Sequence, residues 1–205
     1  MKHTLLCLLA ASGIATASLN ATAATPVQPQ DKTLQPIQLN VPDLKRGAPV
    51  MQALASRQSI KKCADRMLSE QDLSDLIWAA NGINRPKSGK RTAPSAMNRQ
   101  DVKVYVCTAE GSYLYNPKAG TLDPITAGDA RPADAPVVLV LVTDTDETWA
   151  ALDAGIVSQN ISLFCSGTGL ATYPRANMDR DKLKEALKLT GTQTIMLCNP
   201  VGYTK

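Results

Sequence analysis

The chain has 205 residues, of which 44% are hydrophobic, 20% charged and 4% aromatic, and its formal net charge is +4. This composition is typical of a globular protein and excludes fibrous and intrinsically disordered classes. The net charge is also too small for a nucleic-acid-binding protein, so no nucleic-acid partner is expected.

The N-terminus resembles a secretory signal peptide. Lys2 and His3 precede an apolar run that ends in small residues and the pattern Ala21-Thr22-Ala23. We therefore expect cleavage of residues 1–23 and a periplasmic or secreted protein with a net charge of +3. No other apolar run approaches the length of about 20 residues needed to span a bilayer, so no membrane association is expected.

Cleavage would remove His3, the only histidine in the chain. This excludes Ser-His-Asp and Cys-His nucleophilic pairs, His-ligated zinc and histidine bases from the mature protein. Asp144 to Glu147 lacks the glycine and the distant glutamate of a calcium loop, so no metal site is predicted.

Four cysteines would remain, and they allow either two disulfides in three possible pairings or buried thiols. The apolar surroundings of three of them favour buried thiols. There is no C-x-x-C pattern, which argues against a thioredoxin-type site and a zinc knuckle. The four are Cys63, Cys107, Cys165 and Cys198.

The first part of the mature chain is expected to contain an arm and two helices. Residues 24–47 are rich in Pro and Gln and indicate an extended arm or linker. A helix is expected over residues 48–57, and a second one starts at a capping-box-like Ser69 and ends at Gly82. Its apolar stripe is formed by Leu73, Leu76, Ile77 and Ala80.

Strands and helices alternate in the remainder. After a basic segment over residues 84–91, Pro94 indicates a helix start. The continuously apolar residues 136–142 predict a central strand covered on both faces. Trp78 and Trp149 are expected in the core. The other predicted elements are strands 102–107 and 113–115, helix 149–165 with Thr145 or Asp146 as cap and Gly167 to Gly169 at its end, helix 179–189, and strand 193–201. The element order predicts an α+β fold.

Two constellations point to a site. Arg57, Ser59 and Lys61 alternate along an extended segment, which places a guanidinium, a hydroxyl and an ammonium on one side of the backbone. Such donors suit a phosphate, although basic triplets also occur on solvated surfaces. Lys62 alternates to the opposite side. The second constellation is Pro94-Ser95-x-x-Asn98-x-Gln100.

Taken with Asp153-Ala154-Gly155 and Gln159-Asn160 on the following buried helix, these motifs resemble the nitroreductase family of FMN flavoproteins. Residues 72–85 and 200–203 are similar to its compact branch related to the SagB and thiazoline-oxidase type dehydrogenases. The resemblance covers residues 48–205, which we interpret as one nitroreductase-like domain.

The resemblance implies a central, mostly antiparallel sheet flanked by helices, with FMN at the interface of a homodimer. It implies an FMN-dependent oxidoreductase that transfers hydride through flavin N5 between a small-molecule donor and an acceptor. Helix 149–165 would contribute to the two-fold interface. The implied cofactor-binding residues are Arg57, Ser59, Lys61, Pro94, Ser95, Asn98, Pro174, Arg175, Ala176 and Lys205.

The chain departs from the family pattern at three positions. Gln58 replaces a second arginine, Cys63 replaces an aromatic residue, and Arg175 replaces an acidic residue. Gln58, Arg175 and the expected export of the protein keep open a flavin-binding or interaction protein of the same fold without turnover. A secreted dehydrogenase that modifies peptides is a further alternative, and it rests on the branch similarity alone.

Overall fold

The computed structural model describes residues 33–205. The signal peptide predicted over residues 1–23 and the beginning of the arm expected over residues 24–47 lie outside the described residues. Four α-helices occur in the described part: α1 (Val50–Ser56), α2 (Glu70–Asn81), α3 (Thr148–Thr168) and α4 (Arg180–Ala186).

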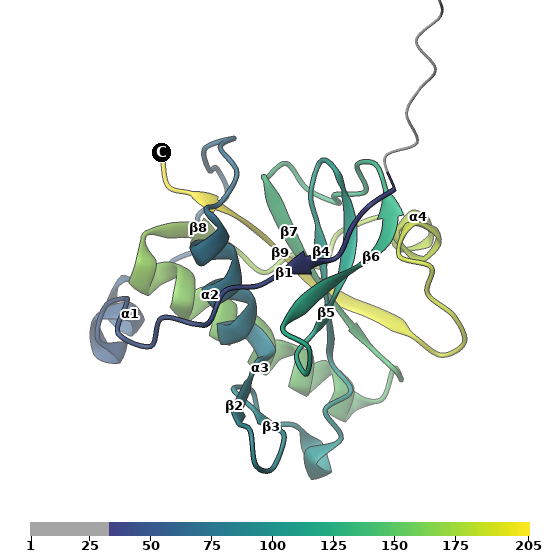
Figure 1. The fold of residues 1–205 in the computed structure, drawn as a ribbon, viewed down its shortest axis with the longest axis horizontal. Helices are drawn as coiled ribbons and strands as arrows, with labels where there is room; N and C mark the ends of the chain where they lie inside the picture. Colours follow the sequence, from purple (N-terminus) through teal and green to yellow (C-terminus); the bar gives the residue numbers. More distant parts are fainter. Residues whose placement is uncertain (1–32) are drawn as a thin grey trace, which may run out of the picture. The chain divides into compact units, whose positions relative to one another are not determined.

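The main sheet has seven strands, and every neighbouring pair in it is antiparallel. Figure 1 shows α2 and α3 beside this sheet and α4 at another side of it. The fold is therefore α+β with an antiparallel central sheet, which confirms the prediction. In their order across the sheet the strands are β1 (Ile37–Gln38), β6 (Thr121–Ala127), β5 (Gly111–Asn116), β4 (Lys103–Cys107), β7 (Val137–Thr143), β9 (Thr194–Tyr203) and β8 (Leu170–Thr172).

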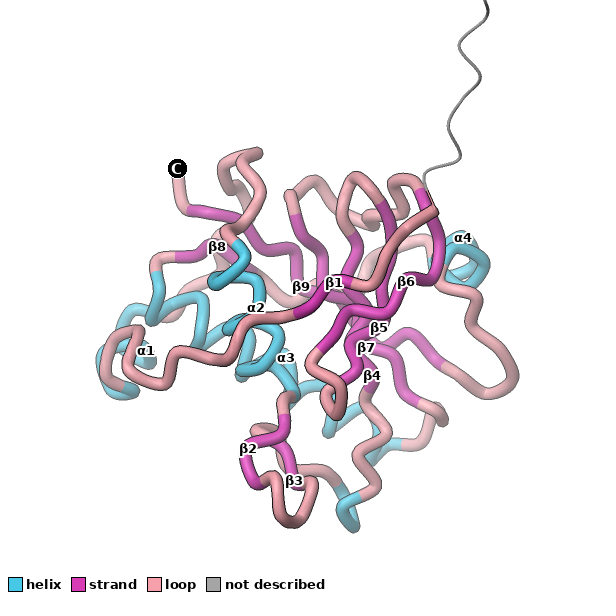
Figure 2. Tube along the Cα trace, in the orientation of Figure 1, coloured by secondary structure: helices cyan, strands magenta, loops and turns pink. Residues whose placement is uncertain are grey.

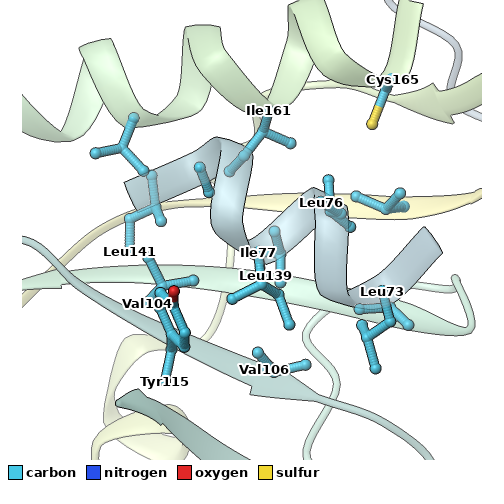
Figure 3. Close-up of a cluster of buried hydrophobic side chains, with 14 of the residues drawn as sticks. Leu73, Leu76, Ile77, Val104, Val106, Tyr115, Leu139, Leu141, Ile161 and Cys165 are labelled. Carbon is cyan, nitrogen blue, oxygen red and sulfur yellow. The ribbon is translucent and has the colours of Figure 1, made fainter. Parts of the chain in front are cut away.

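Strand β7 lies between β4 and β9, and all its residues are buried. A strand in this position needs apolar side chains on both faces. One face packs against α2 and α3 through residues shown in Figure 3, among them Leu76, Ile77, Leu139 and Ile161. The opposite face packs against Leu183 and Leu187. The predicted central strand is thus confirmed.

Helix α2 begins as predicted, because the Ser69 side chain accepts a hydrogen bond from the Asp72 backbone N–H at 3.1 Å. Helix α3 ends at Gly169, which has a left-handed φ of +76°. Its N-cap is Glu147, so the predicted cap at Thr145 or Asp146 was wrong. The prediction that Trp149 is a core residue was also wrong, because the first turn of α3 leaves this side chain 57% exposed.

The sequence patterns missed three strands of the main sheet. Strand β6 contains Pro124 and pairs with the neighbouring β5. The three-residue β8 and the two-residue β1, which adds part of the arm to the sheet edge, pair with segments far away in the chain. A separate hairpin, β2 (Ile83–Arg85) with β3 (Lys90–Arg91), leaves the end of α2 (Figure 2). The helix start expected at Pro94 is only a 3-10 turn over Ala96–Asn98.

The four cysteines of residues 33–205 are free. Cys107, Cys165 and Cys198 are buried, and burial raises the pKa of each thiol. This agrees with the expectation of buried thiols for these three. None of the helices in residues 33–205 is long and apolar enough to cross a membrane.

Candidate functional site

The first group of candidate residues lies on the extended segment after α1. The backbone N–H of Ile60 donates to the Thr172 carbonyl at 3.0 Å, and that of Ala64 donates to the Tyr203 carbonyl at 2.8 Å. These bonds hold residues 57–64 beside β8 and the end of β9. Arg57, Ser59 and Lys61 are all exposed on this segment.

The cations of this segment have no internal partners. Among residues 33–205, no carboxylate lies within 4.0 Å of Arg57 or Lys61, and their side chains make no hydrogen bond. The same holds for Lys205, whose charge acts on the nearby Cys63 thiol. Uncompensated cations at the end of one sheet suit an anionic group such as a phosphate.

A glycine allows the segment to lie this close to β9. A Cβ atom at Gly202 would stand 2.7 Å from the Cys63 sulfur and 3.1 Å from Pro136. A bulky aromatic side chain in place of Cys63 would meet the same strand. Cys63 is therefore a small side chain in a narrow gap, and burial, with Asp134 and Asp65, raises the pKa of its thiol. This gives the departure at position 63 a packing reason.

The second group lies at the beginning of α3. The Ala96 backbone N–H donates to both carboxylate oxygens of Asp153, at 3.1 and 3.0 Å, and Asp153 is only 4% exposed. The Ser95 hydroxyl accepts a hydrogen bond from the Gln100 backbone N–H at 2.9 Å. Gln100 also donates to the Asn98 side-chain oxygen at 3.1 Å. These bonds fix the loop over residues 94–100.

The backbone of this loop is unusual. Met97, Asn98 and Gln100 have φ values of +51°, +54° and +53°, in the left-handed region that non-glycine residues rarely adopt. Backbone in this region costs on the order of 1–3 kcal/mol per residue and persists only where its surroundings hold it. Pro94, Met97 and Asn98 are exposed, so these residues of the loop are accessible to a ligand.

The third group follows β8. The backbone of Arg175 pairs with that of Cys198 through two hydrogen bonds of 2.8 Å, which fixes the backbone between Pro174 and Ala176 beside β9. The Arg175 guanidinium donates to the Asn177 carbonyl at 2.7 Å. No carboxylate lies within salt-bridge distance of it among residues 33–205.

Two buried polar atoms near these strands were not found by sequence reasoning. The side-chain nitrogen of Asn199 and the hydroxyl of Thr172 have no hydrogen-bond partner in the described part of the chain. Asn199 is fully buried, and its oxygen accepts from Ser158 at 2.9 Å. Buried polar groups without partners are uncommon and ask for a reason, such as a ligand. An isolated Asn in an apolar strand was the only signal in the sequence.

The structure does not bring the first two groups together within one chain. Ser56, next to Arg57, contacts Ser166 near the end of α3 with 2.9 Å between their hydroxyl oxygens. The loop over residues 94–100 is bonded to Asp153 near the start of the same helix. The 13 positions between Asp153 and Ser166 correspond to about 20 Å along the helix axis. The phosphate candidates and the loop candidates thus lie at opposite ends of α3.

Among the described residues, no group of three or more His, Cys, Asp and Glu side chains could hold a metal ion. The cations, backbone groups and polar side chains of the three groups favour the binding of an extended anionic ligand.

The comparisons with known proteins place the chain in a family. The model of the nitroreductase family matches residues 54–203. A putative nitroreductase from Ralstonia eutropha JMP134 is 31% identical, with 85% of this chain and 91% of that chain covered and a TM-score of 0.80. No curated protein matches the chain.

Two more distant structures share the fold. A putative nitroreductase from Anabaena variabilis ATCC 29413 has a TM-score of 0.64 at 17% identity, covering 76% of this chain and 38% of that one. The Escherichia coli microcin synthetase McbBCD complex has a TM-score of 0.61 at 16% identity, covering 95% of this chain and 85% of that one. The match of the family model over residues 54–203 and the 31% identical structure show that this chain belongs to the nitroreductase family of oxidoreductases.

Proposed function

We propose that the protein is an exported, homodimeric, FMN-dependent oxidoreductase. The observation that carries the proposal is the set of uncompensated cations beside β8 and β9, next to buried polar atoms without partners. When bound, FMN would supply a flavin N5 that accepts hydride from a small-molecule donor and passes the electrons to an acceptor. Export rests on the signal-peptide pattern of residues 1–23.

The phosphate of FMN would be held by Arg57, Ser59, Lys61 and Lys205. Arg57 offers a planar fork, Ser59 a hydroxyl, and the two lysines compact positive charges. The described part of the chain satisfies none of these side chains by itself. Binding a phosphate would therefore cost no internal ion pair.

The polar part of the flavin would meet the strained loop and the backbone after β8. Ser95 and Asn98 would lie against the ribityl chain and the polar ring edge, and Pro94 beside them. The Asn98 oxygen already accepts from Gln100, so its amide nitrogen is free to donate to a ligand. Backbone from Pro174 to Ala176 would approach the N5 region.

The separation of these groups along α3 supports a dimer. Ser56, next to Arg57, contacts the end of α3, whereas the loop that carries Asn98 is bonded to Asp153, about 20 Å away along the helix axis. In a two-fold dimer with α3 at the interface, the start of one α3 can lie beside the end of the other. Each site would then combine the phosphate residues of one subunit with the loop of its partner.

Exposed apolar side chains on two helices fit this interface. Val50, Met51 and Leu54 lie on α1 with 64%, 73% and 47% exposure, and Trp149 and Leu152 on α3 are 57% and 55% exposed. Helix α1 packs against the end of α3, whereas Trp149 and Leu152 lie at its start. In a two-fold dimer, the apolar group of each subunit's α1 can therefore face Trp149 and Leu152 of the other subunit.

A flavin-binding protein without turnover is the second candidate, favoured by the guanidinium of Arg175. This side chain lies without a carboxylate partner next to the backbone that would approach N5. Its charge changes the electrostatic potential that a donor or acceptor meets there.

An absorption spectrum of the purified protein tests the proposal. We expect a flavin spectrum, release of FMN on denaturation, bleaching by an added reductant, and reoxidation that depends on an added quinone. Bleaching without acceptor-dependent reoxidation would instead favour the second candidate. A protein that neither retains FMN nor binds it on titration would refute both.

A further inference from the structure

The positive charge of the chain is concentrated in one short segment. Residues 82–100 contain five cationic residues and no acidic residue, whereas the rest of the chain has a net charge of −1. This segment comprises the β2–β3 hairpin and the loop over residues 94–100. The five are Arg85, Lys87, Lys90, Arg91 and Arg99.

Most of these cations are available to a partner. Of these five residues, only Arg99 forms an ion pair within residues 33–205, with Glu147 at 2.7 Å. Arg85, Lys87 and Lys90 are exposed, and no hydrogen bond of the described residues involves the side chains of the two lysines. Figure 2 shows the hairpin extending from the end of α2, away from the main sheet. The hairpin therefore presents an uncompensated positive surface.

This hairpin is held in one conformation. The Arg85 guanidinium donates to the Arg91 carbonyl at 2.8 Å, which cross-links the two strands, and to the side chain of the neighbouring Asn84 at 3.0 Å. The Thr92 backbone N–H donates to the Gly82 carbonyl at 2.9 Å where the hairpin closes. A rigid element loses little conformational entropy when a partner binds to it.

The hairpin is also bonded to the loop that would contact the flavin. Gln100 donates to the Gly89 carbonyl at 3.2 Å and accepts from Arg91 at 3.1 Å. The same Gln100 is bonded to Ser95 and Asn98. One side chain thus joins the positive surface to the strained loop, so a partner on the hairpin would lie beside the flavin edge.

We propose that the β2–β3 hairpin and Met97 form a docking surface for an acidic electron-carrying protein, which accepts electrons from the flavin. This inference rests on the proposed function and names the class of acceptor. In each turnover two electrons would leave the reduced flavin singly and reduce two ferric haems of such a protein to ferrous haems. The two flavin protons would go to solvent.

A protein fits this surface better than a small anion. The cations are spread along a hairpin of roughly 13 Å, further than one phosphate can span. Met97 projects from the adjoining loop with 76% exposure and adds an apolar contact beside the charges. Transient electron-transfer complexes commonly combine a small interface with complementary charge, which speeds association.

Binding to an acidic haem protein, cytochrome b5, tests the proposal without relying on turnover. Lys87→Glu with Lys90→Glu reverses two exposed charges of the hairpin. Lys182→Glu with Lys184→Glu makes the same change in charge on α4, which packs on the opposite face of the sheet. Calorimetric titration at low ionic strength should show binding weakened about tenfold or more in the hairpin variant and little changed in the α4 variant.

Added salt should weaken binding by the unmutated protein, and basic cytochrome c should bind the hairpin variant better. Equal losses in the two variants would overturn the proposal. The proposal would also be overturned if the hairpin bound phosphatidylglycerol vesicles but not cytochrome b5. A change of oligomeric state confined to the hairpin variant would overturn it as well.

Haem reduction provides a second readout. The hairpin variant should reduce ferric cytochrome b5 about tenfold more slowly at low salt, but its reduction of the neutral quinone menadione should equal that of the unmutated protein. Equal slowing with both acceptors would contradict docking. If the protein binds no flavin, the proposed function is refuted. The calorimetric titration would still show whether the hairpin binds an acidic haem protein.

Discussion

The assignment of the phosphate site depends most on Arg57, and the substitution Arg57→Ala tests it. The Arg57 side chain is exposed and makes no hydrogen bond or ion pair within residues 33–205. Its removal should therefore change the free energy of unfolding by less than about 0.5 kcal/mol. In the FMN complex it would remove a charge-assisted contact of about 1.5–3 kcal/mol, which is roughly a tenfold to hundredfold loss of affinity.

Lys62→Ala is the matched control, because Lys62 is exposed on the same segment and carries the same charge. Quenching of flavin fluorescence during titration of the flavin-free proteins gives the dissociation constants. Riboflavin, which lacks the phosphate, should bind weakly and equally well to both variants and to the unmutated protein. Equal losses of FMN affinity in Arg57→Ala and Lys62→Ala would show a general electrostatic effect and refute the assigned cradle.

Three other substitutions test the surroundings of the site. Arg46→Ala should cost about 2 kcal/mol of unfolding free energy at pH 7, because Arg46 bridges Asp72 and Asp75 in a partly buried cluster. Burial alone would raise the pKa of Asp72, but its hydrogen bonds to Ser69, Tyr203 and Arg46 lower the pKa overall. The stabilisation should therefore be complete above about pH 4 and disappear as the pH falls through the lowered pKa. Urea titrations at several pH values measure it. Asp153→Ala should weaken FMN and riboflavin binding alike, because it releases the Ala96 amide without touching the phosphate contacts, and Asp153→Asn should restore binding. Trp149→Glu should shift the dimer toward monomer in sedimentation, and an unchanged dimer would remove α3 from the interface.

The elements set by local chemistry could be predicted from the sequence. Ser69 caps α2, Gly169 ends α3 in a left-handed conformation, and the apolar run of β7 marks the centre of the sheet. Each of these residues or runs determines the structure only within a few residues of its own position in the chain. Strands β8 and β1 instead depend on partners far away in the chain, so no local pattern marks them.

The apolar pattern of α3 illustrates a second limit. Periodicity shows that Trp149 belongs to an apolar helix, but it does not show whether the covering surface is this chain or another one. For the candidate site, too, the sequence does not show which chain supplies each part. Arg57 and Ser95 were grouped through the family resemblance, and only the packing of α3 reveals that they lie at its opposite ends. The buried amide nitrogen of Asn199 has no counterpart in any sequence pattern.

If each flavin site combines residues of two subunits, two variants with weakened FMN binding should complement each other. Arg57→Ala impairs the phosphate half and Asn98→Ala the loop half, so each homodimer has two defective sites. In a mixed dimer, one site receives both substitutions and the other receives neither. Random exchange of subunits makes half of the dimers mixed, so about one quarter of all sites should regain normal FMN affinity. Mixing the variants after mild dissociation and titrating FMN measures this fraction. If both halves of a site came from one chain, every site in the mixture would keep one substitution and none would recover. The shared site would therefore be refuted if subunit exchange is verified and no site regains normal FMN affinity.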